Sequence, residues 1–401
     1  MPARFMARQP IFDWHLRVYA YELLFRGGPE NYFQPTKHAS PSVIADSVTL
    51  FDLQTLTGHA RAFVNADELA LRLGAPRLLP PKRIVVEILE TVPPSEEVVA
   101  ICRDLRAAGY LLALDDFVDS PKIAPLVELA QFLKVDFRIS DRETRKRVAA
   151  KYAKNGISLL AEKVETELEL EEARSLGFSY FQGYFFCKPF MMETRDIPGN
   201  KLIYLQLLNA VAAPELDYAV IEDLLKREPS LLYRLLRYLN SPLLGLSAEI
   251  NSVRHALTLL GEQEFRRWVS IFAVVFMAEG KPPELIRTAL TRAYFCEEFS
   301  GPAHLTDKRS SLFLMGLLSL TDALLDKPIA EVLGSLPVTQ EVKTALLGGQ
   351  NRLHDVYELL LALERAEWPH LSTYVDRIGC PEEQVPGAYQ AAIQKASAVN
   401  V

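Results

Sequence analysis

Two adjacent aspartates, Asp115 and Asp116, end the apolar run LLAL and are the first residues that point to chemistry. Burying one carboxylate is costly unless it is paired or bound to a metal, and burying two side by side costs more. Other apolar runs also carry polar residues near their ends. These are Glu22 in YELLFR, Asn65 in AFVN, Glu87 and Glu90 in VVEILE, Lys134 in FLKVD, Glu162 in LLAEK and Gln182 in YFQGY.

These residue types favour a hard divalent cation. Oxygen ligands from Asp, Glu and Asn, without His or Cys, suit Mg²⁺ or Mn²⁺. A carboxylate shared by two such ions, together with a lysine, is typical of two-metal phosphodiester hydrolysis. A single acid at a strand end is more often a helix cap or a surface group, and we assign Asp119 and Glu68 to that class.

The elements that must position these residues alternate between strands and helices up to about residue 190. The predicted strands are residues 18–25, 62–67, 83–90, 111–117, 132–137, 158–164 and 180–186. Such alternation predicts a trimmed (β/α)8-type, TIM-like barrel, in which the carboxyl ends of the strands meet at one rim. Between two of the strands, Ser140 and Glu143 predict a capping box at the start of a helix.

From about residue 200 the apolar residues recur at helical spacing, as in PSLLYRLLRYLN, and convincing strands are absent. This pattern predicts an all-α second domain. The Pro and Gly residues of KPFMMETRDIPGNK indicate the boundary. We therefore predict a barrel domain over residues 1–195 and a helical domain over residues 196–401.

The bulk properties narrow the class of protein. The chain has 401 residues and a net charge of −7, and it carries no long basic block, which argues against nucleic acid as a partner. Its apolar runs are shorter than the ~20 residues of a membrane span, and the first residues lack the apolar region of a signal peptide. The four widely spaced cysteines favour reduced thiols. We expect a cytoplasmic protein without membrane contacts.

The ordered strings ELLFR, VN, VEILE, LDDF, KVD, AEKVET and FQGYFFCKP resemble the EAL domain, the cyclic di-GMP phosphodiesterase module of bacteria. The resemblance covers roughly residues 1–195 and implies hydrolysis of cyclic di-GMP to linear pGpG with Mg²⁺ or Mn²⁺. The implied metal ligands are Glu22, Asn65, Glu87, Asp115 and Asp116. The implied catalytic residues are Lys134, Glu162 and Asp116, and the implied substrate-binding residues are Arg26 and Gln182. Glu90 matches the glutamate that anchors the loop after the aspartates.

Several positions depart from the EAL pattern. The first motif reads ELL, and Lys163 stands where the family motif AEGVET has glycine. The family's glycine-rich loop after the aspartates is replaced by VDSP, residues 118–121. Glycine allows positive φ, whereas proline fixes φ and lacks a backbone donor. The segment from Lys134 to Glu162 is also about a dozen residues shorter than the family pattern. These departures predict weak or regulated activity.

The second half resembles the HDOD domain, a helical relative of HD-type phosphohydrolases. The stretch LNSPLLGLSAEINSVRHALTLLG carries this resemblance. Where an HD enzyme would have its His-Asp pair, the chain reads GLLSL, with Ser319 and Leu320, so we predict that this half is non-catalytic. His354 and Asp355 lie some 35 residues further on without a suitably spaced partner, and we interpret them, like His255, as structural.

Together the halves resemble EAL–HDOD two-domain bacterial signalling proteins. One hypothesis is a cyclic di-GMP phosphodiesterase coupled to a regulatory HDOD domain. The alternative is an inactive EAL domain that serves as a nucleotide receptor or an interaction scaffold, and a third is a different metal-dependent barrel hydrolase. The resemblance also implies an unidentified protein partner of the HDOD domain and a homodimer formed through the barrel.

Overall fold

The computed structural model describes residues 4–27, 53–153, 156–187, 199–213, 215–227, 255, 258, 260–336 and 338–399. Its contacts group the chain into two compact units. The first unit comprises Met1–Lys188 with Glu358–Gln394, and the second comprises Pro189–Tyr357 with Lys395–Val401. The predicted boundary between residues 195 and 196 lies outside the described residues and stays a prediction.

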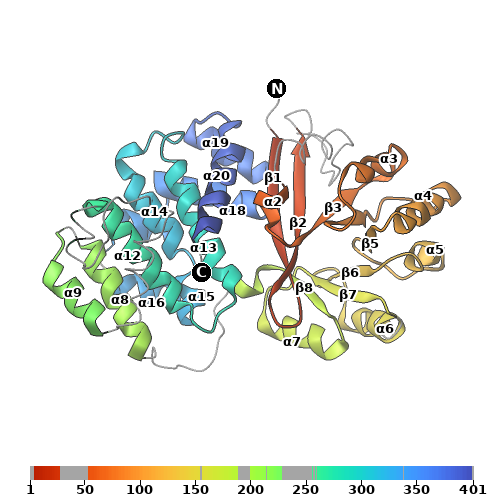
Figure 1. The fold of residues 1–401 in the computed structure, drawn as a ribbon, viewed down its shortest axis with the longest axis horizontal. Helices are drawn as coiled ribbons and strands as arrows, with labels where there is room; N and C mark the ends of the chain where they lie inside the picture. The colour runs from red at the N-terminus through yellow and green to blue at the C-terminus, as the bar shows by residue number, and fades with distance from the viewer. Residues whose placement is uncertain are drawn as a thin grey trace. The chain divides into compact units, whose positions relative to one another are not determined.

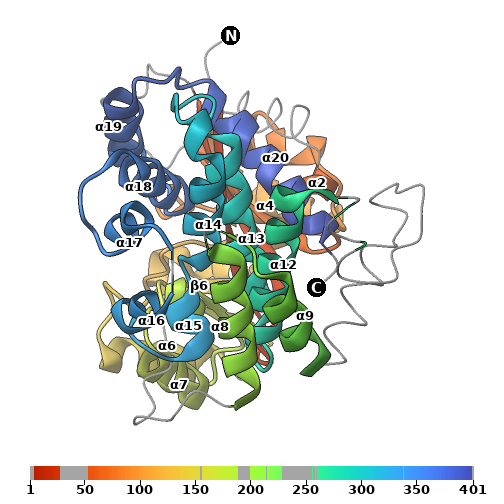
Figure 2. The ribbon, with the colours of Figure 1, turned by 90° about the vertical axis from the view of Figure 1, so that its left-hand side faces the viewer.

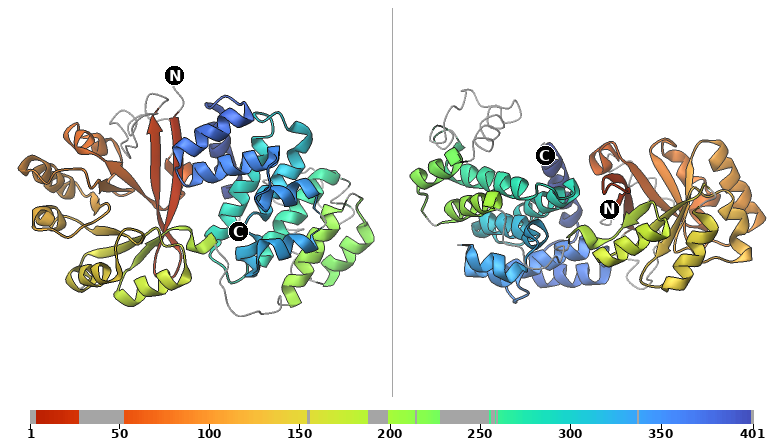
Figure 3. Two further views of the ribbon diagram at one scale, coloured as in Figure 1. Left: turned by 180° about the vertical axis from the view of Figure 1, so that it is seen from behind. Right: turned by 90° about the horizontal axis from the view of Figure 1, so that it is seen from below.

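Eight strands form a closed barrel in chain order, β1 to β8, which confirms the predicted fold class. Strands β2 to β8 pair in parallel, whereas β1 is antiparallel to both β2 and β8 and closes the ring. The strands are β1 (Arg4–Phe12), β2 (Val18–Gly27), β3 (Arg61–Ala66), β4 (Ile84–Ile88), β5 (Leu111–Leu114), β6 (Phe132–Asp136), β7 (Ser158–Glu162) and β8 (Tyr180–Gln182). Figure 3 shows the long β1–β2 hairpin from behind and the barrel from below.

Strand β1 was missed in the sequence, where RFMARQPIF carries two arginines and a proline. Ile11 nevertheless belongs to the core cluster inside the barrel, and Ala7 is also fully buried. The hairpin with β2 explains how a strand with this composition forms. Nine successive positions pair from Arg4↔Gly27 to Phe12↔Val18, and Asp13 caps the turn by accepting hydrogen bonds from the amides of His15 and Arg17.

Helices cover the outside of the barrel, as Figure 1 shows for α3 to α7. Their bounds are α2 (Leu53–Thr57), α3 (Glu68–Arg72), α4 (Glu96–Ala107), α5 (Ala124–Val127), α6 (Arg142–Tyr152) and α7 (Glu167–Leu176). The predicted capping box at Ser140 is wrong, because α6 begins one residue later. Asp141 is its N-cap and accepts a hydrogen bond of 2.7 Å from the Thr144 amide, while the Ser140 hydroxyl donates to the carbonyl of Asp136.

An apolar layer fills the barrel and supports the rim. It consists of inward-facing residues of successive strands: Ile11, Ala20, Phe63, Val85, Ala113, Phe132 and Leu160, with Tyr180 of β8 packed against them. Because side chains on a strand alternate between two faces, the residue two positions further along each strand also faces inward. This period fixes which side chains reach the rim.

The described residues after Gly199 form helices joined by turns and include no strand, which confirms the predicted all-α half. Its helices are α8 (Gly199–Ala212), α9 (Tyr218–Arg227), α12 (Glu262–Met277), α13 (Pro283–Glu298), α14 (Arg309–Leu318), α15 (Thr321–Leu325), α16 (Ile329–Ser335), α17 (Gln340–Leu346), α18 (Arg352–Glu364), α19 (Trp368–Ile378) and α20 (Gln384–Ala398). Within the second unit α8 packs on α12 and α13 packs on α14 (Figure 2). Among the described residues, no helix is long and apolar enough to cross a membrane.

Candidate active site

The polar side chains that the sequence predicts at the strand ends lie together at the rim of the barrel. Each follows a residue of the apolar layer by two positions, from Ala20 to Glu22 on β2 and onward to Tyr180 and Gln182 on β8. The members that lie in or directly after a strand are Glu22, Asn65, Glu87, Asp115, Lys134, Glu162 and Gln182, and all seven are buried. Seven strands therefore bring buried polar groups to the rim of the barrel.

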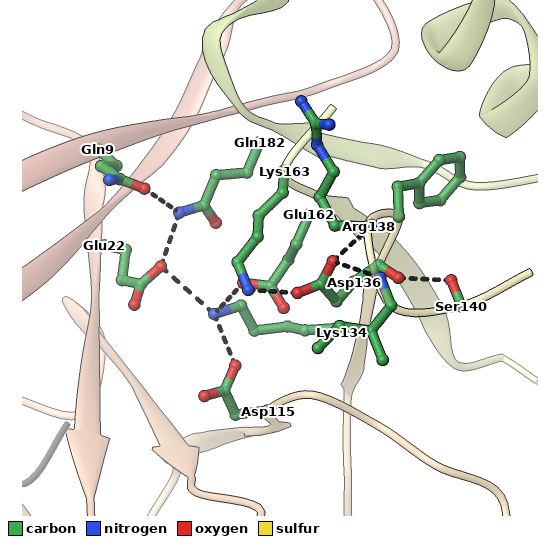
Figure 4. Close-up of polar contacts among 12 residues, drawn as sticks. Gln9, Glu22, Asp115, Lys134, Asp136, Arg138, Ser140, Glu162, Lys163 and Gln182 are labelled. Atoms are coloured by element: carbon green, nitrogen blue, oxygen red, sulfur yellow. Dashed lines mark hydrogen bonds and ion pairs between the residues drawn. The ribbon is translucent and has the colours of Figure 1, made fainter. Parts of the chain in front are cut away.

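Lys134 lies at the centre of this rim and is fully buried. Its Nζ is 2.8 Å from Glu162 Oε1, 3.2 Å from Asp115 Oδ1 and 3.3 Å from Glu22 Oε2, and it also pairs with Glu87 Oε1. Figure 4 shows Lys134 reaching between Asp115, Glu22 and Glu162. One ammonium thus faces four carboxylates, which leaves an excess of negative charge in a site with little access to water.

The excess of negative charge and the burial together shift the pKa values of the rim residues. Burial, and then the neighbouring Glu22, raise the pKa of Glu87 well above its ordinary value. Burial also raises the pKa of Glu162 to about 8, although Lys134 acts in the opposite direction. For Lys134, burial lowers the pKa, but the four carboxylates outweigh burial and hold its pKa well above the ordinary value. The carboxylates therefore gain from any further cation that enters the rim.

The oxygen atoms of the rim fit a divalent cation. Four buried side-chain oxygens of the rim have no hydrogen-bond partner among the described residues: Asn65 Oδ1, Glu87 Oε2, Glu162 Oε2 and Gln182 Oε1. A buried acceptor without a partner costs free energy, so such atoms usually face a ligand, an ion or water. Unsatisfied carboxylate and amide oxygens, without a His or Cys ligand among them, are the donor set of Mg²⁺, Mn²⁺ or Ca²⁺.

Asp116 and Glu90 extend this set on the outer side of Asp115. One ligand oxygen from each of Glu90, Asp115 and Asp116 lies within 4.8 Å of the other two. Asp116 has φ of 41°, a left-handed conformation that is uncommon for a residue with a side chain. Strained backbone of this kind often accompanies functional sites. Glu90, which the resemblance assigns to anchoring the following loop, is exposed beside the two aspartates.

The segment after the two aspartates is held by Asp119. Its carboxylate accepts 2.8 Å hydrogen bonds from Lys151 Nζ and a 2.6 Å bond from the Tyr152 hydroxyl, both on α6. The hydrogen bonds of Lys151 and Tyr152 lower the pKa of Asp119. The loop without glycine is thus tied to α6, while Val118 remains 70 % exposed beside it. The interpretation of Asp119 as an ordinary surface or cap residue does not predict these contacts with α6.

Two residues of the site were missed in the sequence. Gln9 on β1 pairs in register with Glu22, and its Oε1 accepts a 3.1 Å hydrogen bond from Gln182 Nε2, which also donates a 2.6 Å bond to Glu22 Oε2. Asp136 ends β6 opposite Glu162 and pairs with Lys163 Nζ. The two-residue period could have found Gln9, which precedes the buried Ile11 by two positions, had β1 been recognised.

We expect Gln9→Leu to lower kcat/KM for the reaction proposed below by about threefold to tenfold, the effect of one lost hydrogen bond. Without Gln9 Oε1, the amide nitrogen of Gln182 keeps only Glu22 as an acceptor. The oxygen of the Gln182 amide is then less well oriented. Steady-state kinetics would measure the change, with Gln394→Leu on the exposed surface of α20 as the matched control. Equal kinetics for both variants would show that Gln9 does not position the rim.

The raised pKa of Glu162 predicts a pH-dependent stability of the metal-free protein. Between the ordinary value of 4.5 and about 8, the folded protein keeps a proton that the unfolded chain has lost. Stability therefore falls as the pH rises through this window. Thermal unfolding in EDTA should show this decrease, and Glu162→Gln should flatten it. Added Mn²⁺ should raise the unfolding temperature more at pH 8 than at pH 6, because protons compete with the metal. An unchanged profile in Glu162→Gln would contradict this assignment.

The other predicted residues lie elsewhere or are only partly described. Arg26 belongs to β2, where its backbone pairs with Phe5, but its side chain is outside the described residues. Ser319 is buried, donates to the Gly316 carbonyl and accepts a 3.2 Å hydrogen bond from Arg292 Nη1. The ring nitrogen Nδ1 of His354 lies 3.0 Å from the Ala345 carbonyl oxygen, a contact expected of a structural histidine.

Two family models match separate stretches of the chain. The EAL domain model matches residues 51–189, and the HDOD domain model matches residues 197–325. The EAL match begins after Glu22 and Arg26, the part of the chain where the first motif reads ELL.

The chain is similar to two proteins over nearly its whole length. It is 34 % identical to the cyclic di-GMP phosphodiesterase CdgJ of Vibrio cholerae over 96 % of this chain and 90 % of that protein. It is also 34 % identical to the uncharacterized protein YuxH of Bacillus subtilis over 91 % of both chains.

Among solved structures, a standalone EAL protein of Vibrio cholerae bound to c-di-GMP matches with a TM-score of 0.37 and 22 % identity, over 47 % of this chain and 92 % of that chain. The EAL-domain protein YkuI of Bacillus subtilis, in complex with c-di-GMP and calcium, matches with a TM-score of 0.39 and 18 % identity, over 64 % and 73 %. On the two domain matches and the full-length relatives, the chain belongs to the family of EAL–HDOD two-domain proteins.

Proposed function

We propose that the barrel is a divalent-metal-dependent phosphodiesterase that hydrolyses one phosphodiester bond of cyclic di-GMP to give linear pGpG. The observation that carries the proposal is the buried rim, where four carboxylates face Lys134 and four oxygens have no partner in the described part of the chain. The similarity to a protein named as a cyclic di-GMP phosphodiesterase over 96 % of the chain supports the choice of substrate.

The residues proposed to hold Mg²⁺ or Mn²⁺ are Glu22, Asn65, Glu87, Asp115 and Asp116, with Asp115 and Asp116 reaching a second ion. The bound ions would lower the pKa of a water molecule and stabilise the charge that develops on the phosphate. A buried site of this kind keeps bulk water away from the reacting groups, which strengthens every electrostatic interaction inside it.

The chain's own residues are proposed to bind and orient the reactants. Lys134 Nζ, held by its carboxylate partners, is proposed to help position the attacking water. Glu162 is proposed to hold a proton of that water, and the amide of Gln182 to orient the nucleotide. The Arg26 guanidinium is proposed to bind the phosphate, a role that suits its planar set of donors.

The test is incubation of the full-length protein with cyclic di-GMP and Mg²⁺ or Mn²⁺, followed by chromatography of the products. The proposal expects pGpG with metal and none in EDTA. Calorimetry separates the remaining outcomes. Micromolar binding of cyclic di-GMP without turnover would indicate a receptor, and absence of both binding and turnover would indicate a scaffold.

For the helical half we propose a regulatory role through an unidentified protein partner, and for the barrel a homodimer. Both rest on the resemblance to the EAL–HDOD family. Light scattering on the full-length protein tests the dimer, and a monomer at micromolar concentration would contradict it. Affinity capture with and without residues 197–325, the HDOD match, tests the partner, and equal capture by both forms would contradict an HDOD interaction.

A further inference from the structure

The last residue of α18 contacts strand β1 inside the first compact unit. Glu364 ends the helix, so its carbonyl oxygen has no amide partner within α18. Gln9 Nε2 donates a long hydrogen bond of 3.4 Å to this carbonyl oxygen. The next residue, Arg365, places its guanidinium 5.8 Å from the centre of the ring of Tyr184. The end of α18 therefore contacts Gln9, which holds Gln182, and also the segment that follows Gln182 along the chain.

The amides of Gln9 and Gln182 form a chain of hydrogen bonds between α18 and the rim. Gln9 Oε1 accepts from Gln182 Nε2 at 3.1 Å, and Gln182 Nε2 donates to Glu22 Oε2 at 2.6 Å (Figure 4). An amide carries its donor and its acceptor on different atoms. The Glu364 carbonyl binds the donor of Gln9, which leaves the acceptor of Gln9 for Gln182. Acceptors at both ends of this chain thus fix both amides in one orientation, in which Gln182 Oε1 is a buried acceptor without a partner among the described residues.

The other end of α18 is held in the second compact unit. The helix is continuous across Tyr357, where the assignment of residues changes from the second unit to the first. Just before the helix, Asn351 Oδ1 accepts from the His354 amide at 2.8 Å, and Asn351 Nδ2 donates to the Glu341 carbonyl at 2.8 Å. Because backbone hydrogen bonds join each turn of a helix to the next, a displacement of the first turn also moves the last turn.

We propose that α18 is a coupling helix, whose last turn positions the amides of Gln9 and Gln182, so that a displacement of its first turn changes turnover at the barrel rim. This inference rests on the proposed function and describes how the same site is regulated. A partner that binds the helical half more tightly when α18 is displaced would lower turnover without contacting the rim.

The first test changes the C-terminal cap of α18 in the full-length protein. Ala366 has φ of 56°, a left-handed conformation that closes the helix. Ala366→Val disfavours this conformation and should displace the Glu364 carbonyl, whereas Ala366→Gly favours it and is the matched control. Two readouts are compared. One is the kcat/KM for cyclic di-GMP, and the other is the pair of side-chain amide NMR signals of Gln9 and Gln182 in protein labelled with ¹⁵N-glutamine, assigned with Gln9→Leu and Gln182→Leu.

We expect Ala366→Val to lower kcat/KM by about threefold, the effect of one long hydrogen bond, and to shift both amide signals. Ala366→Gly should leave both readouts unchanged. In a Gln9→Leu background, Ala366→Val should cost no further activity, because its effect passes through Gln9. Unchanged amide signals in Ala366→Val would overturn the inference, as would the same loss of activity with and without Gln9.

The second test acts on the start of α18. Asn351→Ala removes both hydrogen bonds of this side chain and should shift the same two amide signals. Asp217→Ala is the matched control, because Asp217 Oδ1 accepts the first amides of α9 in the same way, and it should leave the signals unchanged. No shift in Asn351→Ala would overturn the coupling. Because the amide signals do not depend on turnover, the expected shifts in a protein that fails to hydrolyse cyclic di-GMP would contradict only the proposed function.

Discussion

Replacing Asp115 with asparagine is expected to lower the kcat/KM for cyclic di-GMP by about a thousandfold or more, equivalent to roughly 4 kcal/mol of transition-state stabilisation. Asp115 is the carboxylate proposed to contact both metals, and it also lies 3.2 Å from Lys134 Nζ. An amide of the same shape keeps one oxygen but removes the negative charge that neutralises the ions. Product formation in Mn²⁺ measures the effect, with Asp104→Asn on the exposed face of α4 as the control.

The same variant should not lose stability. The charge of Asp115 raises the pKa values of Glu87 and Glu162, so its removal relieves repulsion among the rim carboxylates. The unfolding temperature in EDTA should therefore equal or exceed that of the wild type. An Asp115→Asn protein that keeps wild-type turnover would show that this carboxylate takes no part in the reaction. A protein that loses activity only by unfolding would show that its role is structural.

Replacing Lys134 with methionine is expected to have the largest effect on stability, about 3–5 kcal/mol of the free energy of unfolding. The change removes the ammonium that contacts four buried carboxylates, and water cannot replace it because Lys134 is fully buried. Urea unfolding of the barrel in EDTA measures this loss. Mn²⁺ should restore part of it, since the metal supplies positive charge to the same oxygens.

Lys146→Met is the matched control for this experiment. Lys146 pairs with Glu143 at 2.8 Å on the surface, and loss of such an exposed pair costs less than about 1 kcal/mol. Unfolding of Lys134→Met at the same urea concentration as this control would contradict the view that Lys134 holds the rim together. Failure of Mn²⁺ to stabilise Lys134→Met would contradict the shared use of the rim oxygens by the lysine and the metal.

Much of the fold and site could be predicted because the signals are periodic. The predicted strands β2 to β8 carry apolar runs whose polar residues follow inward-facing positions by two residues, so a barrel must bring those polar residues to one rim. This rule predicts the position of the acids at the ends of β4 and β5. It does not predict strand β1, because the arginines and the proline of β1 hide the alternation and its position depends on pairing with β2.

The remaining features depend on contacts that the sequence pattern does not encode. The partner of Asp119 lies 32 residues away on α6, and the contact of Lys163 with Asp136 depends on the direction of one long side chain. The sequence shows Lys163 as a departure from a glycine motif. Its left-handed φ and its ion pair with Asp136 are visible only in the structure. Helix α6 begins one residue later than predicted, because the Ser140 hydroxyl donates to the Asp136 carbonyl and Asp141 caps the helix instead.

The most direct test of the central claim, a metal site on the rim that acts on cyclic di-GMP, is anomalous diffraction from crystals grown with Mn²⁺ and cyclic di-GMP. The account predicts an Mn²⁺ peak about 2.0–2.6 Å from oxygens of Asn65, Glu87 and Asp115, with a phosphate of the nucleotide on the same ion. Metal bound away from these oxygens, or nucleotide bound outside the rim, would contradict it.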